Sequence, residues 1–357
     1  MYRKKIISIF LLVAVLSVHL FSRQPHWVEK YYANGFYPAV SLLLRCMLGW
    51  VPFSFGDVLY GLVFFLLVRS IFLKGRSFFN KKVSTNVKSD SFYVLFMWLA
   101  VIYLIFNIFW GINYNRLGVG YQLDMKIENY SKEDLKKINS LLCAKVNAYK
   151  LQSLQDSNRA NGNLNLFKQT PIAYSNAAKK YPFLNLKHPV LKKSLWGWLG
   201  NYLGFAGYHN PFTGESQVNT QVPFFLQPYI ACHELGHQLG YAKEMEANFV
   251  GYLVARESED PSFQYSAYLQ LFGYANSNLY ATDSISAKQY RAALLPSVKV
   301  DLLEWRQYNI RYKNPVEPVI NWLYGLFLKG NQQPQGIMSY DKVTAFLIAF
   351  YKKYGMI

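Results

Sequence analysis

Two histidines separated by four positions carry the clearest chemical signal in this chain. They occur in the segment His233-Glu234-Leu235-Gly236-His237. Residues four apart project from one face of a helix, so both imidazoles can bind one metal ion. Zinc suits this pair because it accepts imidazole nitrogen, prefers four ligands and keeps one position for water in catalytic sites. Glu234 is adjacent to the first histidine, where it can take a proton from that water as a general base.

The alternative is that these residues merely decorate a surface helix. The residues that flank them are apolar, namely Ile230, Ala231, Cys232, Leu235 and Leu239. A helix with such neighbours is expected to be largely buried, where unpaired histidine and glutamate side chains are unfavourable. We therefore expect a metal site, with Cys232 as a small buried residue rather than a further ligand.

The third protein ligand must come from another segment. Lys243 occupies the position where a His-x-x-Gly-x-x-His continuation would place a third histidine, so that subtype is excluded. Gly240 permits a sharp turn that brings the segment from Glu244 beside the metal. Glu244 and Glu246 face different directions on a helix, so only one of them is expected to bind. We favour Glu244 over Glu246, because Asn248 then lies one turn further on and can orient one of the histidines.

A β-hairpin is predicted just before this motif, in the stretch from Gly204 to Val222. The segment Asn210–Gly214 contains proline and glycine and is typical of a turn. In the second arm Val218, Thr220 and Val222 alternate with polar residues, which is the period of a half-exposed strand. His209, in the first arm, is a candidate for stabilising a reaction oxyanion, although histidines beside hairpins are more often structural.

The other predicted elements position these groups. Two helices are expected around the motif, from Pro228 to about Gly240 and from about Lys243 to Arg256. Further helices are expected after a cap formed by Ser131 with Asp134, and from Tyr340 to Tyr354. A polar loop is expected at Asp156–Gly162.

The first third of the chain is predicted to be a membrane anchor. Hydrophobic residues make up 52% of the sequence and charged residues only 16%, well below the quarter usual for soluble domains. Residues 6–21, 58–73 and 92–110 form apolar runs, and the last is long enough to span a bilayer. Gly35–Val51 is predicted to be an interfacial or re-entrant helix.

The distribution of charge along the sequence indicates how the chain is oriented in the membrane and does not indicate nucleic-acid binding. The net charge is +18, but there is no basic stripe interleaved with aromatics, so nucleic acid is not expected as a partner. Basic residues instead flank the apolar runs, at Arg3-Lys4-Lys5 and in the loop from Lys74 to Asp90. The positive-inside rule assigns both to the cytoplasmic side. Three spans would then place everything after Trp110 outside the cytoplasm.

Several segments carry a family resemblance. The His-Glu-x-x-His motif followed by a helical glutamate resembles the gluzincin metallopeptidases, and Glu244 to Tyr252 is similar to the Glu-x-Glu-Ala-Asn helix of several bacterial zinc peptidases. The whole chain resembles domain of unknown function 3810, a bacterial membrane family, through Pro52–Asp57, Trp110–Arg116, Asn210–Glu215 and Ser339-Tyr340. The zincin resemblance covers only about Gly204 to Arg256. It implies that the strand ending near Val222 is a sheet edge where an extended peptide substrate pairs, at Val218, Asn219 and Thr220.

Together these features predict an architecture. Residues 1–112 are expected to form a helical membrane anchor of about three transmembrane helices. Residues 113–357 are expected to form an α+β, mainly helical, zincin-like domain with a small β-sheet. The family resemblance implies a multi-pass protein of the bacterial cytoplasmic membrane, with the catalytic domain on the extracytoplasmic side.

The predicted function is that of a membrane-anchored zinc metallopeptidase. Zn²⁺ would be held by His233, His237 and Glu244, with Glu234 activating water against a peptide bond. The expected partners are a peptide or protein substrate and the lipid bilayer. Two alternatives stay open: a zinc-dependent amide hydrolase acting on cell-wall peptide, and a non-catalytic metal-binding sensor or scaffold.

Overall fold

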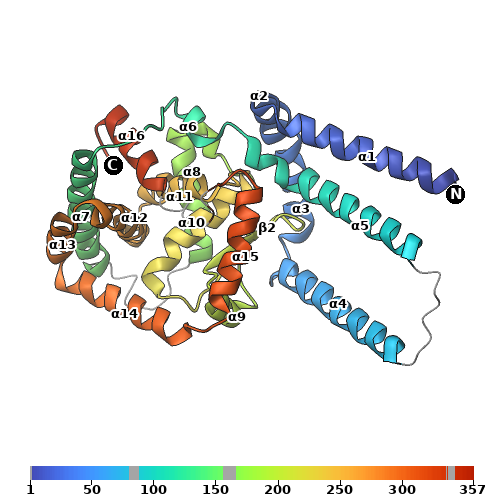
Figure 1. Cartoon of the computed structure of the whole chain (residues 1–357). Coiled ribbons are helices and arrows are strands. Elements are labelled where there is room, and N and C mark those ends of the chain that lie inside the picture. Colours follow the sequence, from blue (N-terminus) through green and yellow to red (C-terminus); the bar gives the residue numbers. More distant parts are fainter. Residues whose placement is uncertain (1, 80–87, 156–165, 335, 337–341) are drawn as a thin grey trace.

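The structure is a computed structural model that describes residues 2–79, 88–155, 166–334, 336 and 342–357. Within these ranges the chain is mainly helical and has one three-stranded sheet, which agrees with the predicted helical α+β composition. Figure 1 shows helices α1 (Tyr2–Ser22), α4 (Phe55–Phe79) and α5 (Lys88–Phe109) projecting together from one side of a helical body. The polar loop at Asp156–Gly162 and the Ser339-Tyr340 pair lie outside the described residues, as do residues 80–87 of the basic loop.

The projecting helices support fewer membrane spans than the three predicted. Among the described residues, Phe55–Leu73 is the helix long and apolar enough to cross a membrane. Ile6–Ser22 and Pro25–Leu48 form a pair bent by 92°, which adds a second candidate if the pair is one span. Tyr93–Phe109 is apolar but shorter. The structure thus supports one or two of the three predicted spans, and a crossing by Tyr93–Phe109 stays a prediction.

The connection between α1 and α4 packs against the helical body. It consists of α2 (Pro25–Trp27), the π-helix η1 (Val28–Phe36) and α3 (Tyr37–Leu48), where an interfacial helix was predicted. Its buried residues form one apolar cluster with residues that follow α5, namely Val28, Tyr32, Tyr37, Trp110, Ile112, Tyr114 and Ala242. Contacts thus cross the predicted boundary between residues 112 and 113.

The structure contains the predicted hairpin, but the second strand of the hairpin is buried rather than half-exposed. Strand β2 (Gly207–Asn210) pairs antiparallel with β3 (Glu215–Val218), and β1 (Leu191–Lys193) pairs parallel with β3. The strand order is β1-β3-β2, so β3 is the central strand. All four residues of β3 are buried, because β1 and β2 cover its edges and helix α10 packs on it. Its alternating polar residues are therefore buried, and the expectation of a half-exposed strand was wrong.

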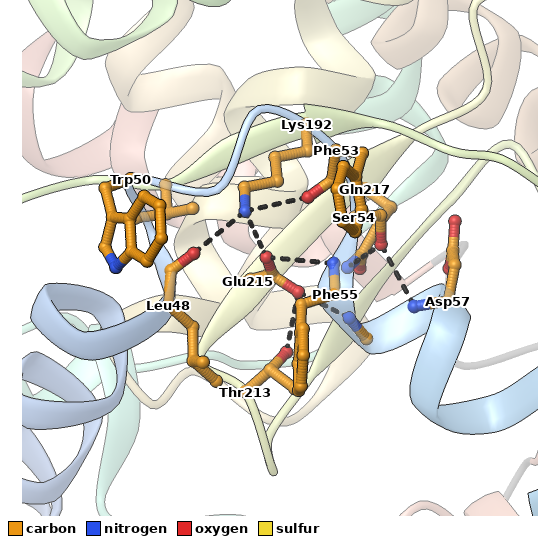
Figure 2. Close-up of polar contacts among 12 residues, drawn as sticks. Leu48, Trp50, Phe53, Ser54, Phe55, Asp57, Lys192, Thr213, Glu215 and Gln217 are labelled. Carbon is orange, nitrogen blue, oxygen red and sulfur yellow. Dashed lines mark hydrogen bonds and ion pairs between the residues drawn. The ribbon is translucent and has the colours of Figure 1, made fainter. Parts of the chain in front are cut away.

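A buried ion pair joins this sheet to the start of α4 (Figure 2). Lys192 of β1 and Glu215 of β3 contact each other directly. The Glu215 carboxylate also accepts hydrogen bonds from the backbone N–H groups of Phe55, at 3.3 Å, and Gly56, at 2.6 Å. These N–H groups begin α4, where a helix leaves its donors unpaired and favours a negative charge. Asp57 extends the junction by accepting hydrogen bonds from the Tyr208 hydroxyl and the Leu195 N–H.

The helical body holds the main core. Helix α7 (Lys132–Gln155) packs along α12 (Pro261–Thr282), and α10 (Gln227–Gln238) packs along α11 (Glu244–Arg256), which α16 (Val343–Tyr354) covers. The predicted cap before α7 is confirmed, since Ser131 and Asp134 exchange side-chain and backbone hydrogen bonds of 2.9 and 3.0 Å. The remaining longer helices are α8 (Leu166–Lys180), α9 (Gly197–Leu203), α13 (Ser284–Ala292), α14 (Pro296–Tyr312) and α15 (Glu317–Gly330).

Candidate metal centre

The two helices that carry the predicted ligands fold back on each other through a glycine turn. Helix α10 has Pro228 in its first turn, which suits a residue without an N–H donor. Gly240 follows it with φ at +82°, and a Cβ atom there would lie 2.8 Å from the Asn113 amide oxygen. Glycine alone meets both conditions without strain. Helix α11 then begins at Glu244 and returns along α10, close to the bounds predicted for both helices.

This arrangement brings three potential ligand atoms together. The Nε2 atoms of His233 and His237 are 3.1 Å apart. Oε2 of Glu244 lies 3.2 Å from the first and 3.7 Å from the second. Ligand atoms about 2.1 Å from a tetrahedral zinc ion are separated by roughly 3.4 Å, so these spacings fit such an ion.

The general-base candidate lies beside this group. Ligand atoms of His233, Glu234 and His237 all fall within 4.8 Å of one another. Oε2 of Glu234 is buried, and the described residues supply it with no hydrogen-bond partner. A buried carboxylate oxygen without a donor is unfavourable unless a proton, a water molecule or a cation meets it.

Hydrogen bonds orient both histidines. Nδ1 of His237 lies 2.7 Å from the backbone oxygen of Tyr241. An N–H donated to this carbonyl leaves Nε2 free to bind a metal. Burial opposes protonation of His233, but the hydrogen bond to Glu244 and the neighbouring side chains of Glu234 and Asn248 raise its pKa. Asn248 therefore lies where the sequence prediction placed an orienting partner.

Glu244 has a partner that the sequence did not indicate. The hydroxyl of Tyr324, on α15, donates a 2.6 Å hydrogen bond to Oε1 of Glu244. The backbone N–H of Glu244 donates to the side-chain oxygen of Gln333 at 3.1 Å. Both partners are about 80–90 positions away along the chain. No local pattern connects them to the motif, so only the tertiary fold identifies them.

Burial and mutual charge set the protonation of the cluster. Burial raises the pKa of Glu234 to about 8. Burial likewise lowers the pKa of His237 to about 4. Burial opposes ionisation of Glu244 as well, but the hydrogen bond from His233 and the histidine charges lower its pKa to about 2. An ionised Glu244 and a neutral His237 are the forms that bind metal ions.

Glu246, the alternative third ligand, points elsewhere. A Cβ atom placed at Gly118 would lie 1.9 Å from its Oε1, so the carboxylate packs against that glycine. Burial raises the pKa of Glu246, against the opposing charges of Lys243 and Arg116. Of the two glutamates left open by the sequence, Glu244 is the one whose carboxylate contacts the histidines.

Residues from the N-terminal third hold the turn between α10 and α11. Arg116 binds Glu29 of η1 through two hydrogen bonds of 2.8 and 3.2 Å. The same guanidinium donates to the Leu239 oxygen at 3.0 Å and lies 4.3 Å from the centre of the Tyr241 ring. The Tyr37 hydroxyl donates to the backbone oxygen of His237 at 3.2 Å.

His209 is placed behind His237 rather than over the reaction space. Its ring lies 6.5 Å from that of His237 and 5.0 Å from Trp110. Nδ1 of His209 is 3.2 Å from the Ser216 hydroxyl. Burial and the charge of His237 hold the pKa of His209 well below its usual value. These contacts suit a packing residue.

A cavity of about 600 Å³ opens beside His233 and Glu234. Strand β2 reaches it at Gly207, where a Cβ atom would lie 2.5 Å from Oε1 of Glu234, so any side chain there would collide with the base. The described lining includes no lysine or arginine and contains Asn201, Asn248, Gln270, Tyr274, Trp305, Tyr308, Asn309, Glu317, Asn321 and Tyr324.

The predicted substrate strand is not at an edge. Val218 pairs with Lys193 on one side and with Gly207 on the other. Beyond it, the Asn219 side chain hydrogen-bonds within the body to Gly197 and Asn201, and Thr220 follows the strand end. The prediction that residues 218–220 offer a free edge was therefore wrong, because β1 occupies that side. β2 is the edge strand beside the cavity.

The model of one protein family, described as protein of unknown function DUF3810, matches residues 32–348. The chain belongs to the DUF3810 family. Because the match begins within η1, the DUF3810 region includes α3, α4 and α5 as well as the helical body. No curated protein and no solved structure matches the chain.

Proposed function

We propose that this chain is a membrane-anchored zinc metallopeptidase. The observation that carries the proposal is the convergence of His233, His237 and Glu244 on one point. The Glu234 carboxylate, whose Oε2 has no hydrogen-bond partner among the described residues, lies beside it, and a cavity opens there. Two neutral imidazoles and one carboxylate form a donor set that zinc prefers. A hydrolytic zinc site also needs a base within reach and space for a substrate.

Each residue has a distinct role in this mechanism. Bound zinc would supply a Lewis acid and a water molecule of lowered pKa. Glu234 lies where it could accept a proton from a water molecule and return it to the leaving amine, and its buried position beside the ligands suits a group that both takes and gives a proton. Asn248 and the Tyr241 carbonyl fix the histidine rings, and Tyr324 fixes Glu244. Strand β2 offers an extended substrate a hydrogen-bonding edge beside the base.

The same proposal includes a location. Helices α1, α4 and α5, which project together from the body (Figure 1), anchor the chain in the bacterial cytoplasmic membrane, and their three crossings leave the body outside the cytoplasm. A purely structural metal site would need neither Glu234 nor the adjoining cavity, which favours the enzyme over a sensor or scaffold. An amide of cell-wall peptide would be cleaved by the same chemistry, so it stands as a substrate alternative within this proposal.

Zinc content and hydrolysis of the purified full-length protein test the proposal. We expect the wild type and Glu234→Gln to bind one zinc ion per chain, and His233→Asn to lose it. His188→Asn is the matched control, because His188 is exposed and its positive φ of +50° suits asparagine. Peptide hydrolysis should disappear in Glu234→Gln while zinc stays bound. A folded wild type that binds no zinc, or a fully active Glu234→Gln variant, would refute the proposal.

A further inference from the structure

Helix α15 has two opposite faces of different character. Glu317, Asn321 and Tyr324 lie on one face and line the cavity. The other face is apolar and exposed, with Trp322 63% accessible. It consists of Val319, Trp322, Leu323 and Leu326, at the spacing of a single helical stripe.

Helix α9, which lies beside α15, extends this apolar surface. Its exposed large side chains, with those just before the helix, are Leu195, Trp196, Trp198, Leu199 and Tyr202. We call these residues and the apolar stripe of α15 the apolar rim. Exposed apolar side chains on two helices in contact, three tryptophans among them, are more than the scattered apolar residues that soluble surfaces tolerate.

The apolar rim is continuous with the projecting helices. The indole N–H of Trp196 donates a hydrogen bond to the backbone oxygen of Asp57 at 3.1 Å. The Trp196 ring also lies 3.1 Å from the point where a Cβ atom of Gly61 would be. Near the other end of the rim, the ring of Phe327 on α15 lies 6.0 Å from that of Phe106 on α5. The apolar rim therefore adjoins α4 and α5 at these two contacts.

The direction of α15 fits a membrane surface. Figure 1 shows α15 running across the direction of α4 and α5, on the side of the body from which they project. A helix so placed lies in the plane that the spans would cross. Lys329 in the last turn of α15 and Lys313, which follows α14 just before α15, are exposed and can meet anionic headgroups.

We propose that the apolar rim lies in the bilayer interface and that the substrates are membrane-tethered polypeptides. The second part rests on the proposed peptidase function; the first part does not. Helices α9 and α15 separate the cavity from the rim, so the catalytic base lies about one helix diameter, roughly 10 Å, beyond the lipid surface. A polypeptide leaving the bilayer beside α4 would reach the cavity within a few extended residues.

Lipid quenching of single labelled cysteines tests the contact with the bilayer. The background is full-length Cys46→Ser, because the other two cysteines, Cys143 and Cys232, are buried. A fluorophore is attached at Leu323→Cys in the rim, at Leu67→Cys in α4, or at Ile285→Cys. Ile285 is the matched control, an exposed apolar residue on α13, on the side of the body away from α4 and α5 (Figure 1). The proteins are reconstituted into vesicles of phosphatidylcholine and phosphatidylglycerol that contain lipids quenching at shallow or deep positions.

The label at position 323 should be quenched several-fold more than that at 285, most strongly by the shallow quencher. The label at 67 should respond most to the deep one. If 67 is quenched and 323 behaves like 285, the rim is not in lipid and the inference fails. Shielding of 323 that depends on protein density would mean that a second copy covers the rim, which also overturns it. Absence of quenching at 67 would refute membrane anchoring and this inference together.

A second comparison tests the substrate class. The wild type, Leu323→Glu and Ile285→Glu are each reconstituted into the same vesicles and given one peptide in two forms. In one form the peptide is free in solution, and in the other it is linked to an acyl chain that anchors it in the vesicle. We expect the wild type and the Ile285 variant to prefer the tethered peptide. The Leu323 variant should lose that preference while keeping its zinc and its rate on free peptide. Equal rates on both peptides in the wild type would overturn the substrate assignment, whereas hydrolysis of neither would count against the peptidase itself.

Discussion

Glu215 is the residue whose removal should most weaken the junction between α4 and the sheet. Its side chain is fully buried and contacts the Lys192 ammonium. It also accepts hydrogen bonds from the N–H groups of Phe55 and Gly56 and from the Thr213 hydroxyl, at 3.3, 2.6 and 3.0 Å. Removing one partner of a buried ion pair destabilises a protein by about 3–5 kcal/mol. We expect Glu215→Ala to lower the free energy of unfolding by that amount.

The reciprocal change should be milder. In Lys192→Met, the Glu215 carboxylate keeps three donors and the favourable N-terminus of α4. In Glu215→Ala, the Lys192 ammonium keeps only the backbone oxygens of Leu48 and Phe53, at 3.1 and 3.0 Å. The double variant should be more stable than Glu215→Ala alone, because it leaves no unpaired buried charge.

Thermal unfolding of the detergent-solubilised full-length protein, followed by tryptophan fluorescence, measures these effects. For a chain of 357 residues, a loss of 3–5 kcal/mol corresponds to a drop in Tm of roughly 4–7 °C. The control is Lys180→Ala, which removes the more exposed ion pair with Glu257, 3.0 Å long, and should change stability by less than about 1 kcal/mol. If Glu215→Ala shifts Tm no more than this control, or if the double variant loses the sum of both single changes, the reasoning is refuted.

Three further predictions concern the metal centre and its cavity. Because the folded pKa of Glu234 is about 8 against its usual 4.5, this group's favourable contribution is complete below pH 4.5 and is lost as pH rises through 8. Metal-free Glu234→Gln should thus melt above the wild type at pH 9 and level with it at pH 4; parallel melting curves would contradict this. Tyr324→Phe removes the hydrogen bond to Glu244 and should weaken zinc binding by about 10–100-fold in a chelator competition. An unchanged zinc affinity would show that Tyr324 does not orient Glu244 as a ligand. Glu317→Lys places a cation in a lining whose described residues have none, and should raise KM for lysine-containing peptides but not for glutamate-containing ones.

The local parts of the site could be predicted because they depend on spacing within one helix. The pair His233 and His237 needs only the helical period, and Asn248 follows from the same period counted from Glu244. The turn at Gly240 was predicted because a helix ending in glycine commonly reverses there. The hairpin around Asn210–Gly214 was predicted for a similar reason, since its turn chemistry is local.

The features that the sequence did not reveal depend on contacts between distant segments. Polar residues that alternate with apolar ones, such as Gln217 before Val218, ordinarily mark a solvent-facing side of a strand. Here Glu215 meets Lys192 and the start of α4, and Gln217 donates to Ser54 at 3.0 Å. The partners Ser54 and Gly56 lie about 160 positions earlier in the chain, so the pattern was interpreted as exposure. The sheet edge was misplaced for the same reason.

These distant contacts also decide how the metal centre must be studied. A fragment beginning at Leu117 would lose Arg116 and Tyr37, which hold the Leu239 and His237 carbonyls at the turn between α10 and α11. It would also lose Trp110, whose ring lies 5.9 Å from that of His237. Ligand positions must be held within about 0.5 Å to bind a metal tightly, and this turn sets the distance between the histidines and the third ligand. Weak zinc binding by such a fragment would therefore reflect the missing N-terminal contacts, and the full chain is the species in which the ligands can be judged.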